Sequence, residues 1–128
     1  MDSRVMAPRC NYCARPSRLV SGAAIYPHRP DLFGKWFYQC KPCDAYVGCH
    51  KGGVPLGDLA NRELRKTRRV AHSVFDRLWK EGDLNRSQAY AWMSEAMGLP
   101  PEKAHIGMFS VEQCRALVNL VAARGVVA

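Results

Sequence analysis

The chain has no apolar run of the roughly 20 residues that a membrane-spanning helix needs. Its first eight residues contain no apolar core of the length that a signal peptide carries. A phosphate-cradling glycine loop, a Ser/His/Asp arrangement and an internal repeat are also missing. We therefore expect a cytoplasmic protein that does not bind membranes, and the sequence favours binding over catalysis. The length of 128 residues fits one domain, or a small metal-held module joined to a compact helical part.

Acidic residues are few, since 11 Asp and Glu stand against 19 Lys and Arg, which gives a net charge of +8. The excess is uneven along the chain. Residues 1–53 hold eight bases and three acids, residues 54–81 hold seven and four, and residues 82–128 hold four of each. A localised positive surface attracts phosphate backbones and gives salt-dependent binding. Composition alone equally fits a soluble protein with a basic bias.

Two Cys-x-x-Cys motifs stand out among the six cysteines: Cys10-Asn-Tyr-Cys13 and Cys40-Lys-Pro-Cys43. Each motif places two thiolates on one tight turn, and two such turns supply the four tetrahedral ligands of a closed zinc site. The intervening residues suffice for a hairpin or two that brings the turns together. We predict one structural Zn²⁺ held by Cys10, Cys13, Cys40 and Cys43. Disulfides are the alternative, which a reducing cytoplasm disfavours.

Two neighbouring residues complicate the ligand count. Cys49 or His50 could replace a motif cysteine or build a second site. We favour Cys49 as a small buried apolar residue and His50 as a surface residue, because four thiolates already complete a tetrahedral shell. Cys114 lies in an apolar helical pattern and is expected in the core.

Segments rich in aromatic and β-branched residues flank the second motif. Residues 18–26, 35–40 and 45–49 are predicted strands, the first with a glycine break. The sequence thus predicts a zinc ribbon over residues 1–53, a small sheet with two Cys knuckles. Such a sheet buries little apolar surface, so metal binding should supply much of its folding free energy.

Residues 54–128 have the periodicity of helices and are expected to pack on the ribbon. Asp58 is a predicted N-cap of a helix that runs to Lys80. Further helices are predicted from capping patterns at residues 85–88 and 110–113, the first ending at Gly98. The predicted fold class is therefore α+β, a zinc ribbon followed by three or so helices.

Basic residues of the first predicted helix fall on the face opposite its apolar residues. Arg62, Arg65, Lys66 and Arg69 form a stripe that could contact successive phosphates, or a solvated face with acids nearby. A proline-bracketed loop carries His28 and Arg29, which could contact a phosphate or base, or belong to an ordinary surface loop. Lys35, at the start of a predicted strand, completes the candidate nucleic-acid-binding set.

His72 and Asp76 lie one helical turn apart. They could belong to a metal site or a general base, or form a hydrogen-bonded pair without chemistry. Together with His50 and His105 they are the candidates for a second site. No nucleophile or second carboxylate is spaced to join them, so no catalytic residue is assigned.

Several strings of this sequence resemble a small zinc-finger-containing family found mainly in bacteriophages and prophages. The strings extend over nearly the whole chain: Cys10-Asn-Tyr-Cys13, Ile25-Tyr-Pro-His-Arg-Pro30, residues 40–51 with the second motif, Pro55-Leu-Gly57, Ala71-His72, Phe75-Asp76, Ala89-Tyr-x-Trp92 and His105-Ile-Gly-Met-Phe109. The resemblance implies a zinc-binding phage protein of the bacterial cytoplasm with the four motif cysteines as ligands. It implies no reaction, and it favours His28, His50, His72, Asp76 and His105 as candidates for a shared surface.

Three functional hypotheses follow from the sequence. The leading one is a zinc-dependent nucleic-acid-binding module, accessory to replication, recombination or transcription. The second is an adaptor or inhibitor that binds a host or phage protein through helical-half anchors, especially Tyr90, Trp92, Met93 and Phe109. The third is a small metal-dependent nuclease that uses His72, Asp76 and another histidine.

Overall fold

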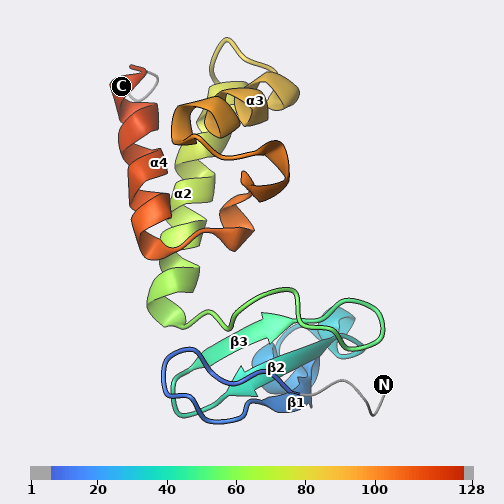
Figure 1. The fold of residues 1–128 in the computed structure, drawn as a ribbon. Helices are drawn as coiled ribbons and strands as arrows, with labels where there is room; N and C mark the ends of the chain where they lie inside the picture. Colours follow the sequence, from blue (N-terminus) through green and yellow to red (C-terminus); the bar gives the residue numbers. More distant parts are fainter. Residues whose placement is uncertain (1–6, 126–128) are drawn as a thin grey trace. The chain divides into compact units, whose positions relative to one another are not determined.

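The computed structural model describes residues 7–125. The chain forms two compact units, residues 1–62 and 63–128, and each is described by itself (Figure 1). A three-stranded sheet with helices confirms the predicted α+β class. The predicted division at residues 53 and 54, and the packing of the helical part on the ribbon, stay predictions.

The first unit is built on an antiparallel sheet in the order β1 (Arg18–Ser21), β2 (Trp36–Cys40) and β3 (Ala45–Gly48). Tyr38 of β2 pairs with Leu19 on one side and Val47 on the other. Because side chains alternate along a strand, Tyr38 and Cys40 share one face of β2, and Phe37 lies on the other. The sheet is thus a three-strand meander that places large side chains on both of its faces.

An aromatic cluster covers the Phe37 face of the sheet. Tyr26, Phe37 and Tyr46 contact one another edge to face, with ring centroids 5.8–6.1 Å apart. The hydroxyls of Tyr26 and Tyr46 are hydrogen-bonded at 3.2 Å. These aromatic residues therefore form a small core on this face of the sheet.

The predicted strand over residues 18–26 is wrong beyond Ser21. Residues Gly22–Ile25 form a one-turn helix, α1, capped by the Ser21 hydroxyl, which accepts a hydrogen bond from the Ala23 N–H at 3.2 Å. Gly22 lies against the short 3₁₀ helix η1 (Pro30–Leu32), and a Cβ there would be 1.8 Å from the Leu32 carbonyl oxygen. The turn is thus capped locally by Ser21 and packs against the segment around Leu32, a contact that sequence propensity does not encode.

Residues 53–60 complete the first unit along β3. Ala60 exchanges two backbone hydrogen bonds with Tyr46, at 3.0 and 3.1 Å, and the Leu56 N–H donates to the Gly48 carbonyl at 2.9 Å. The Tyr38 hydroxyl donates to the Gly53 carbonyl. Because Ala60 is committed to this pairing, the first long helix begins at Arg62, later than the predicted cap at Asp58.

The helices after the sheet are α2 (Arg62–Lys80), α3 (Arg86–Met97) and α4 (Val111–Ala123), with 3₁₀ turns η2 (Pro101–Lys103) and η3 (Ile106–Met108) between the last two. Both predicted capping boxes are confirmed, at Asn85 and Ser110. Gly98 ends α3 with a φ of 65°, the left-handed conformation that favours glycine.

Apolar residues on one face of each predicted helix form the core of the second unit. Leu64, Ala71, Phe75 and Leu78 of α2 are buried, as the periodicity predicts. Buried residues of α3, α4 and the intervening turns join the last three of these: Ala89, Met93, Ala104, Ile106, Phe109, Cys114, Leu117 and Val121. The expected core position of Cys114 is confirmed. Among residues 7–125, no helix is both long enough and apolar enough to cross a membrane.

The close approach at Gly22 yields a test of the first unit. Gly22→Ala should lower the free energy of unfolding by about 1–3 kcal/mol, because the new methyl group meets the Leu32 backbone. Gly34→Ala is the matched control, since a Cβ at Gly34 meets nothing within 4 Å. Urea denaturation of the zinc-loaded chains, followed by near-ultraviolet circular dichroism, measures both. Equal stability of the two variants would contradict the assigned contact.

Candidate metal centre

The first Cys-x-x-Cys motif lies on a tight loop in which residues 8–17 double back. Arg9 pairs with Pro16 in an isolated antiparallel bridge. The Cys10 N–H donates to the Arg15 carbonyl and the Ala14 N–H to the Cys10 carbonyl, both at 2.8 Å. Ala14 has a φ of 65°, so the chain turns in the left-handed conformation directly after Cys13.

The second motif forms the turn between β2 and β3. Cys40 ends β2 and pairs with Ala45, the first residue of β3. The Asp44 N–H donates to the Lys41 carbonyl at 3.0 Å, and Asp44 has a φ of 49°. Both motifs are therefore followed by a left-handed residue whose N–H closes a turn, to the first cysteine in one motif and to the residue after it in the other.

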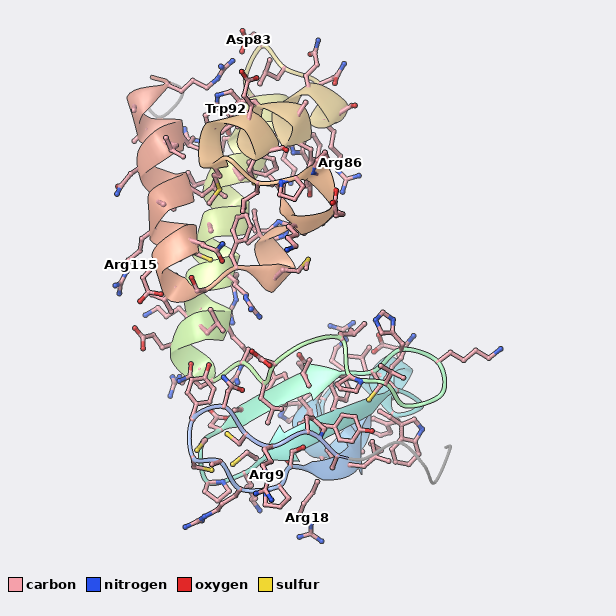
Figure 2. All side chains as sticks on the ribbon, viewed as in Figure 1. Arg9, Arg18, Asp83, Arg86, Trp92 and Arg115 are labelled. Atoms are coloured by element: carbon pink, nitrogen blue, oxygen red, sulfur yellow. The ribbon has the colours of Figure 1, made fainter. Side chains whose placement is uncertain are left out.

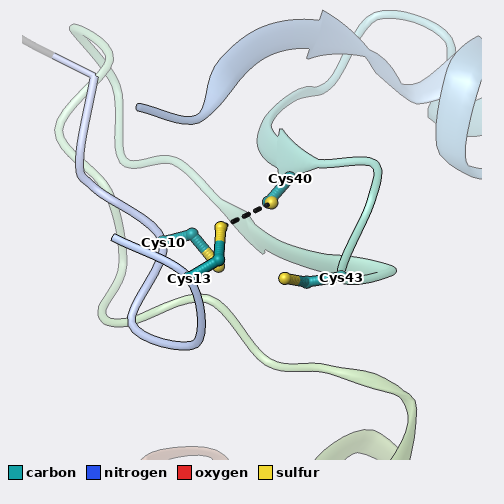
Figure 3. Close-up of side chains that lie close together, drawn as sticks. All are labelled: Cys10, Cys13, Cys40 and Cys43. Carbon is teal, nitrogen blue, oxygen red and sulfur yellow. Dashed lines mark hydrogen bonds between the residues drawn. The ribbon is translucent and has the colours of Figure 1, made fainter. Parts of the chain in front are cut away.

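The two turns bring four sulfurs together. The ligand atoms of Cys10, Cys13, Cys40 and Cys43 all lie within 4.8 Å of one another, and the sulfurs of Cys13 and Cys40 are 3.6 Å apart (Figure 3). Tetrahedral bonds of about 2.3 Å to zinc place sulfurs roughly 3.8 Å apart. The cluster therefore fits one zinc ion, and its four thiolates and closed shell are those of a structural site.

The four thiols and the backbone around them shift one another's pKa values in opposite directions. The Arg15 backbone N–H, helped by neighbouring thiols, lowers the pKa of Cys13 to about 7 against the effect of burial. The hydrogen bond with Cys13, followed by burial, raises the pKa of Cys43 to about 12. Four thiolates at this distance repel one another unless a cation lies between them, and Zn²⁺ supplies that charge.

The cysteine cluster is also the centre of a second small core of the unit, apart from the aromatic cluster. Cys10 and Cys40 are buried with Ala45 and Leu59, and the backbone N–H of Tyr12 approaches the Cys10 sulfur at 3.4 Å. Four buried residues, two of them ligands, supply little hydrophobic stabilisation. The zinc ion would therefore contribute a large part of the folding free energy of this unit.

Cys49 and His50 lie outside the four-sulfur cluster. Cys49 is partly buried and pairs with Pro55 in an isolated bridge, and burial raises the pKa of its thiol. His50 is exposed, and its backbone N–H donates to the Val54 carbonyl at 2.7 Å. The four motif cysteines thus complete the site without either residue.

The candidate contacts on the proline loop differ in their surroundings. His28 and Lys35 are exposed. Arg29 is exposed too, but its guanidinium makes a two-point contact with the Asp31 carboxylate, at 3.0 and 2.8 Å. The positive charge of Arg29 is therefore offset locally, which weakens it as a phosphate contact.

The basic stripe of α2 is exposed over most of its length. Arg62, Lys66 and Arg69 are exposed, whereas Arg65 is partly buried and interacts within the chain. Among residues 7–125, neither Lys66 nor Arg69 has a carboxylate within ion-pair distance. The neighbouring Arg68 has a structural role, since its guanidinium donates to the Phe109 carbonyl at 2.9 Å.

The Nδ1 atom of His72 lies 3.9 Å from Oδ1 of Asp76 on α2. Other groups also contact the Asp76 carboxylate. The Trp79 indole N–H donates to Asp76 at 3.3 Å, and the Lys80 ammonium lies 3.9 Å from it. Among the described residues, no third His, Cys, Asp or Glu joins this pair as a metal ligand. His105 is exposed and its ring contacts Tyr90, with centroids 6.1 Å apart. This arrangement is typical of a surface network.

The side chains expected to anchor a protein partner are buried in the core or pack against it. Met93 is fully buried and Phe109 is 1% exposed. Tyr90 and Trp92 are partly buried and pack against the same core, and the Arg124 guanidinium lies over the Trp92 ring, 5.6 Å from its centroid. The adaptor hypothesis therefore lacks the exposed anchors on which it was based.

Three basic residues beside the knuckles were missed from the sequence. Arg15, Arg18 and Lys41 line one groove of the first unit. They lie within five residues of a ligand cysteine along the chain. That proximity was the available signal, but the groove depends on the pairing of β1 with β2, which the sequence alone does not give.

A family model described as a zinc-finger-containing domain matches residues 6–124. The match includes the four clustered cysteines and the helices of the second unit. No curated protein and no solved structure matches the chain.

The assigned ligand set predicts the outcome of cysteine substitution. Cys13→Ser should weaken zinc binding by more than the roughly 10–100-fold that loss of an outer-shell contact costs, because it removes a ligand. Cys49→Ser should bind one zinc per chain like the wild type, since Cys49 lies outside the cluster. Metal analysis and competition with a chromogenic chelator measure both. Equal loss of zinc from the two variants would contradict the ligand set.

Zinc removal should unfold the two units unequally. A strong chelator should abolish amide hydrogen-exchange protection in β1–β3, whose core is small, and leave α3 and α4 protected by their larger core. Exchange measured by mass spectrometry, with and without zinc re-addition, tests this. Persistent protection of β2 in the metal-free chain would show that zinc is not needed for the sheet.

Proposed function

Because the chain belongs to a family of zinc-finger-containing domains, we propose that it is a zinc-dependent protein that binds nucleic acid through a basic surface. The zinc ion holds the small sheet of the first unit, and cationic side chains hold the phosphate backbone. Phosphate contacts of this kind provide affinity without sequence choice.

The observation that carries the proposal is the row of cations on the first half of α2. Arg62, Lys66 and Arg69 are spaced four and three residues apart, so they share one face of the helix and extend over about 10 Å. All three are exposed. A row of exposed cations at this spacing suits a polyanion with regularly spaced charges.

The second half of the same helix has a different charge arrangement. Arg77 pairs with Glu81 at 2.8 Å, and Lys80 lies 3.9 Å from Asp76. These acids offset the positive charge of their partners. Unbalanced charge on α2 is therefore concentrated between Arg62 and Arg69, which supports a localised contact over a general basic bias.

The resemblance to phage and prophage proteins supports a cellular role for this activity. We propose that the protein acts in the bacterial host cytoplasm as an accessory factor in phage replication, recombination or transcription. A structural zinc site and a backbone-binding surface suit a factor that positions nucleic acid for another protein. The nuclease alternative has less support, because His72 and Asp76 lack a third ligand among the described residues.

Neutralising the cationic row should weaken binding and flatten its salt dependence. For Arg62→Gln/Lys66→Gln/Arg69→Gln, the slope of log K against log salt concentration should become shallower by about 2–3. Each lost phosphate contact accounts for roughly 0.7–0.9 of this change. Fluorescence anisotropy with labelled DNA and RNA across a salt series measures the slope.

The control Arg77→Gln/Lys80→Gln/Lys103→Gln removes the same charge outside the row and should retain most of the wild-type slope. Equal slopes for the two variants would mean that only net charge matters. A wild-type chain that binds no nucleic acid at low salt would refute the proposal. The adaptor alternative would then gain weight, supported by a groove between α2 and α4 in which Val70 is 50% exposed.

A further inference from the structure

A groove of about 570 Å³ runs beside β1 in the first unit, next to both Cys-x-x-Cys turns. The residues that line it come from the first turn, β1, β2 and the second turn: Arg15, Pro16, Arg18, Leu19, Val20, Gln39, Cys40, Lys41 and Pro42. Within residues 7–125, no strand pairs with the outer edge of β1. The groove therefore lies along an accessible sheet edge, and its volume is within the range of ligand-binding sites.

Three cations surround the groove. Arg15 follows the first turn, Arg18 opens β1 and Lys41 lies within the second turn, and all three side chains are exposed. Figure 2 shows Arg18 extending away from the ribbon of β1. Among the described residues, none of the three has a carboxylate partner, and the lining includes no Asp or Glu. Three cations that line one groove without a carboxylate partner among the described residues create a local field that attracts an anion.

The rest of the lining is mostly apolar. Pro16, Leu19, Val20 and Pro42 contribute hydrocarbon surface, and Leu19 is 38% exposed despite its place in the sheet. Gln39 adds an amide that can both donate and accept hydrogen bonds. Cationic groups beside apolar surface suit a ligand that carries a phosphate next to a flat, partly apolar ring.

We propose that this groove binds an unpaired nucleotide of a single-stranded nucleic acid. Arg15, Arg18 and Lys41 hold the phosphates, and the base lies on the apolar surface within reach of the Gln39 amide. A duplex keeps its bases stacked and paired, so it offers this groove only phosphates, whereas a single strand offers both groups. The inference rests on the proposed nucleic-acid binding. It adds that the nucleic acid is single-stranded and that it contacts the groove on the zinc-binding unit.

The same cations could instead balance the zinc site. A zinc ion with four thiolates carries a net charge of −2, and Cys40 borders the groove although it is 4% exposed. In that case neutralising the cations would weaken zinc retention and spare nucleic-acid binding. Measuring zinc retention beside strand affinity therefore separates the two roles.

The test compares two variants of the full zinc-loaded chain that lose the same charge. Arg15→Gln/Arg18→Gln changes the groove, and Lys51→Gln/Lys103→Gln changes two exposed lysines that lie outside its lining and outside the candidate nucleic-acid-binding set. The probes are a labelled oligothymidylate of about 12 nucleotides and its duplex with oligoadenylate. Lys41→Gln provides a second groove variant, should the double variant fail to fold.

We expect the groove variant to bind the single strand about tenfold more weakly than the control variant does, with a smaller loss of duplex affinity and with zinc retention unchanged between them. Equal single-strand affinity of the two variants would overturn the groove assignment and leave nucleic-acid binding standing. Equal losses for strand and duplex would overturn the strand preference. Zinc loss with unchanged single-strand affinity would assign the cations to the metal. Absence of binding by the wild type would refute both proposals.

Discussion

Mutual repulsion among four thiolates, relieved by one dication, is the constraint on which the first unit depends. The sulfurs lie within 4.8 Å of one another, and the core around them consists of little more than Ala45 and Leu59. Zinc therefore joins the loop of residues 8–17 to the turn between β2 and β3. The positions of Arg15 and Lys41 follow from the same ion, because each is close in sequence to a ligand. Metal binding and the surface beside it are thus linked through the backbone.

Local signals made much of the fold predictable. Motif spacing identified the zinc ligands, and the capping residues Asn85 and Ser110 marked where two helices begin. The failures share one physical origin. Residues Gly22–Ile25 form a helix where Gly22 packs against Leu32 and its N–H bonds to the Lys35 carbonyl, and α2 begins late because Ala60 pairs with Tyr46. Both depend on contacts between distant segments, as does the groove beside β1. Local propensity contains no information about such contacts.

Net charge is a poor guide to where a polyanion would bind, because acids offset some bases and not others. Arg29 was a candidate from its exposed loop, yet Asp31 holds its guanidinium at two points. Lys66 was a candidate from its helix face, and among the described residues it has no such partner. The net charge of +8 counts a paired cation such as Arg29 and an unpaired one such as Lys66 in the same way. Only the arrangement of neighbouring carboxylates separates a cation that stabilises its own loop from one that is available to a ligand.

The two Cys-x-x-Cys turns share a left-handed residue directly after the second cysteine, at Ala14 and Asp44. Such a turn fixes the ligand positions through the backbone. The two residues between the cysteines, Asn11-Tyr12 in one turn and Lys41-Pro42 in the other, are mostly exposed. Each turn thus fixes its two ligands through the backbone and leaves side chains between them at the surface. The Tyr12 hydroxyl accepts a hydrogen bond from the Asn61 N–H at 3.1 Å, so that side chain also ties its turn to the segment that leads into α2. Asn11, Lys41 and Pro42 are therefore the positions at which substitution would alter the surface beside the metal with the least effect on its coordination.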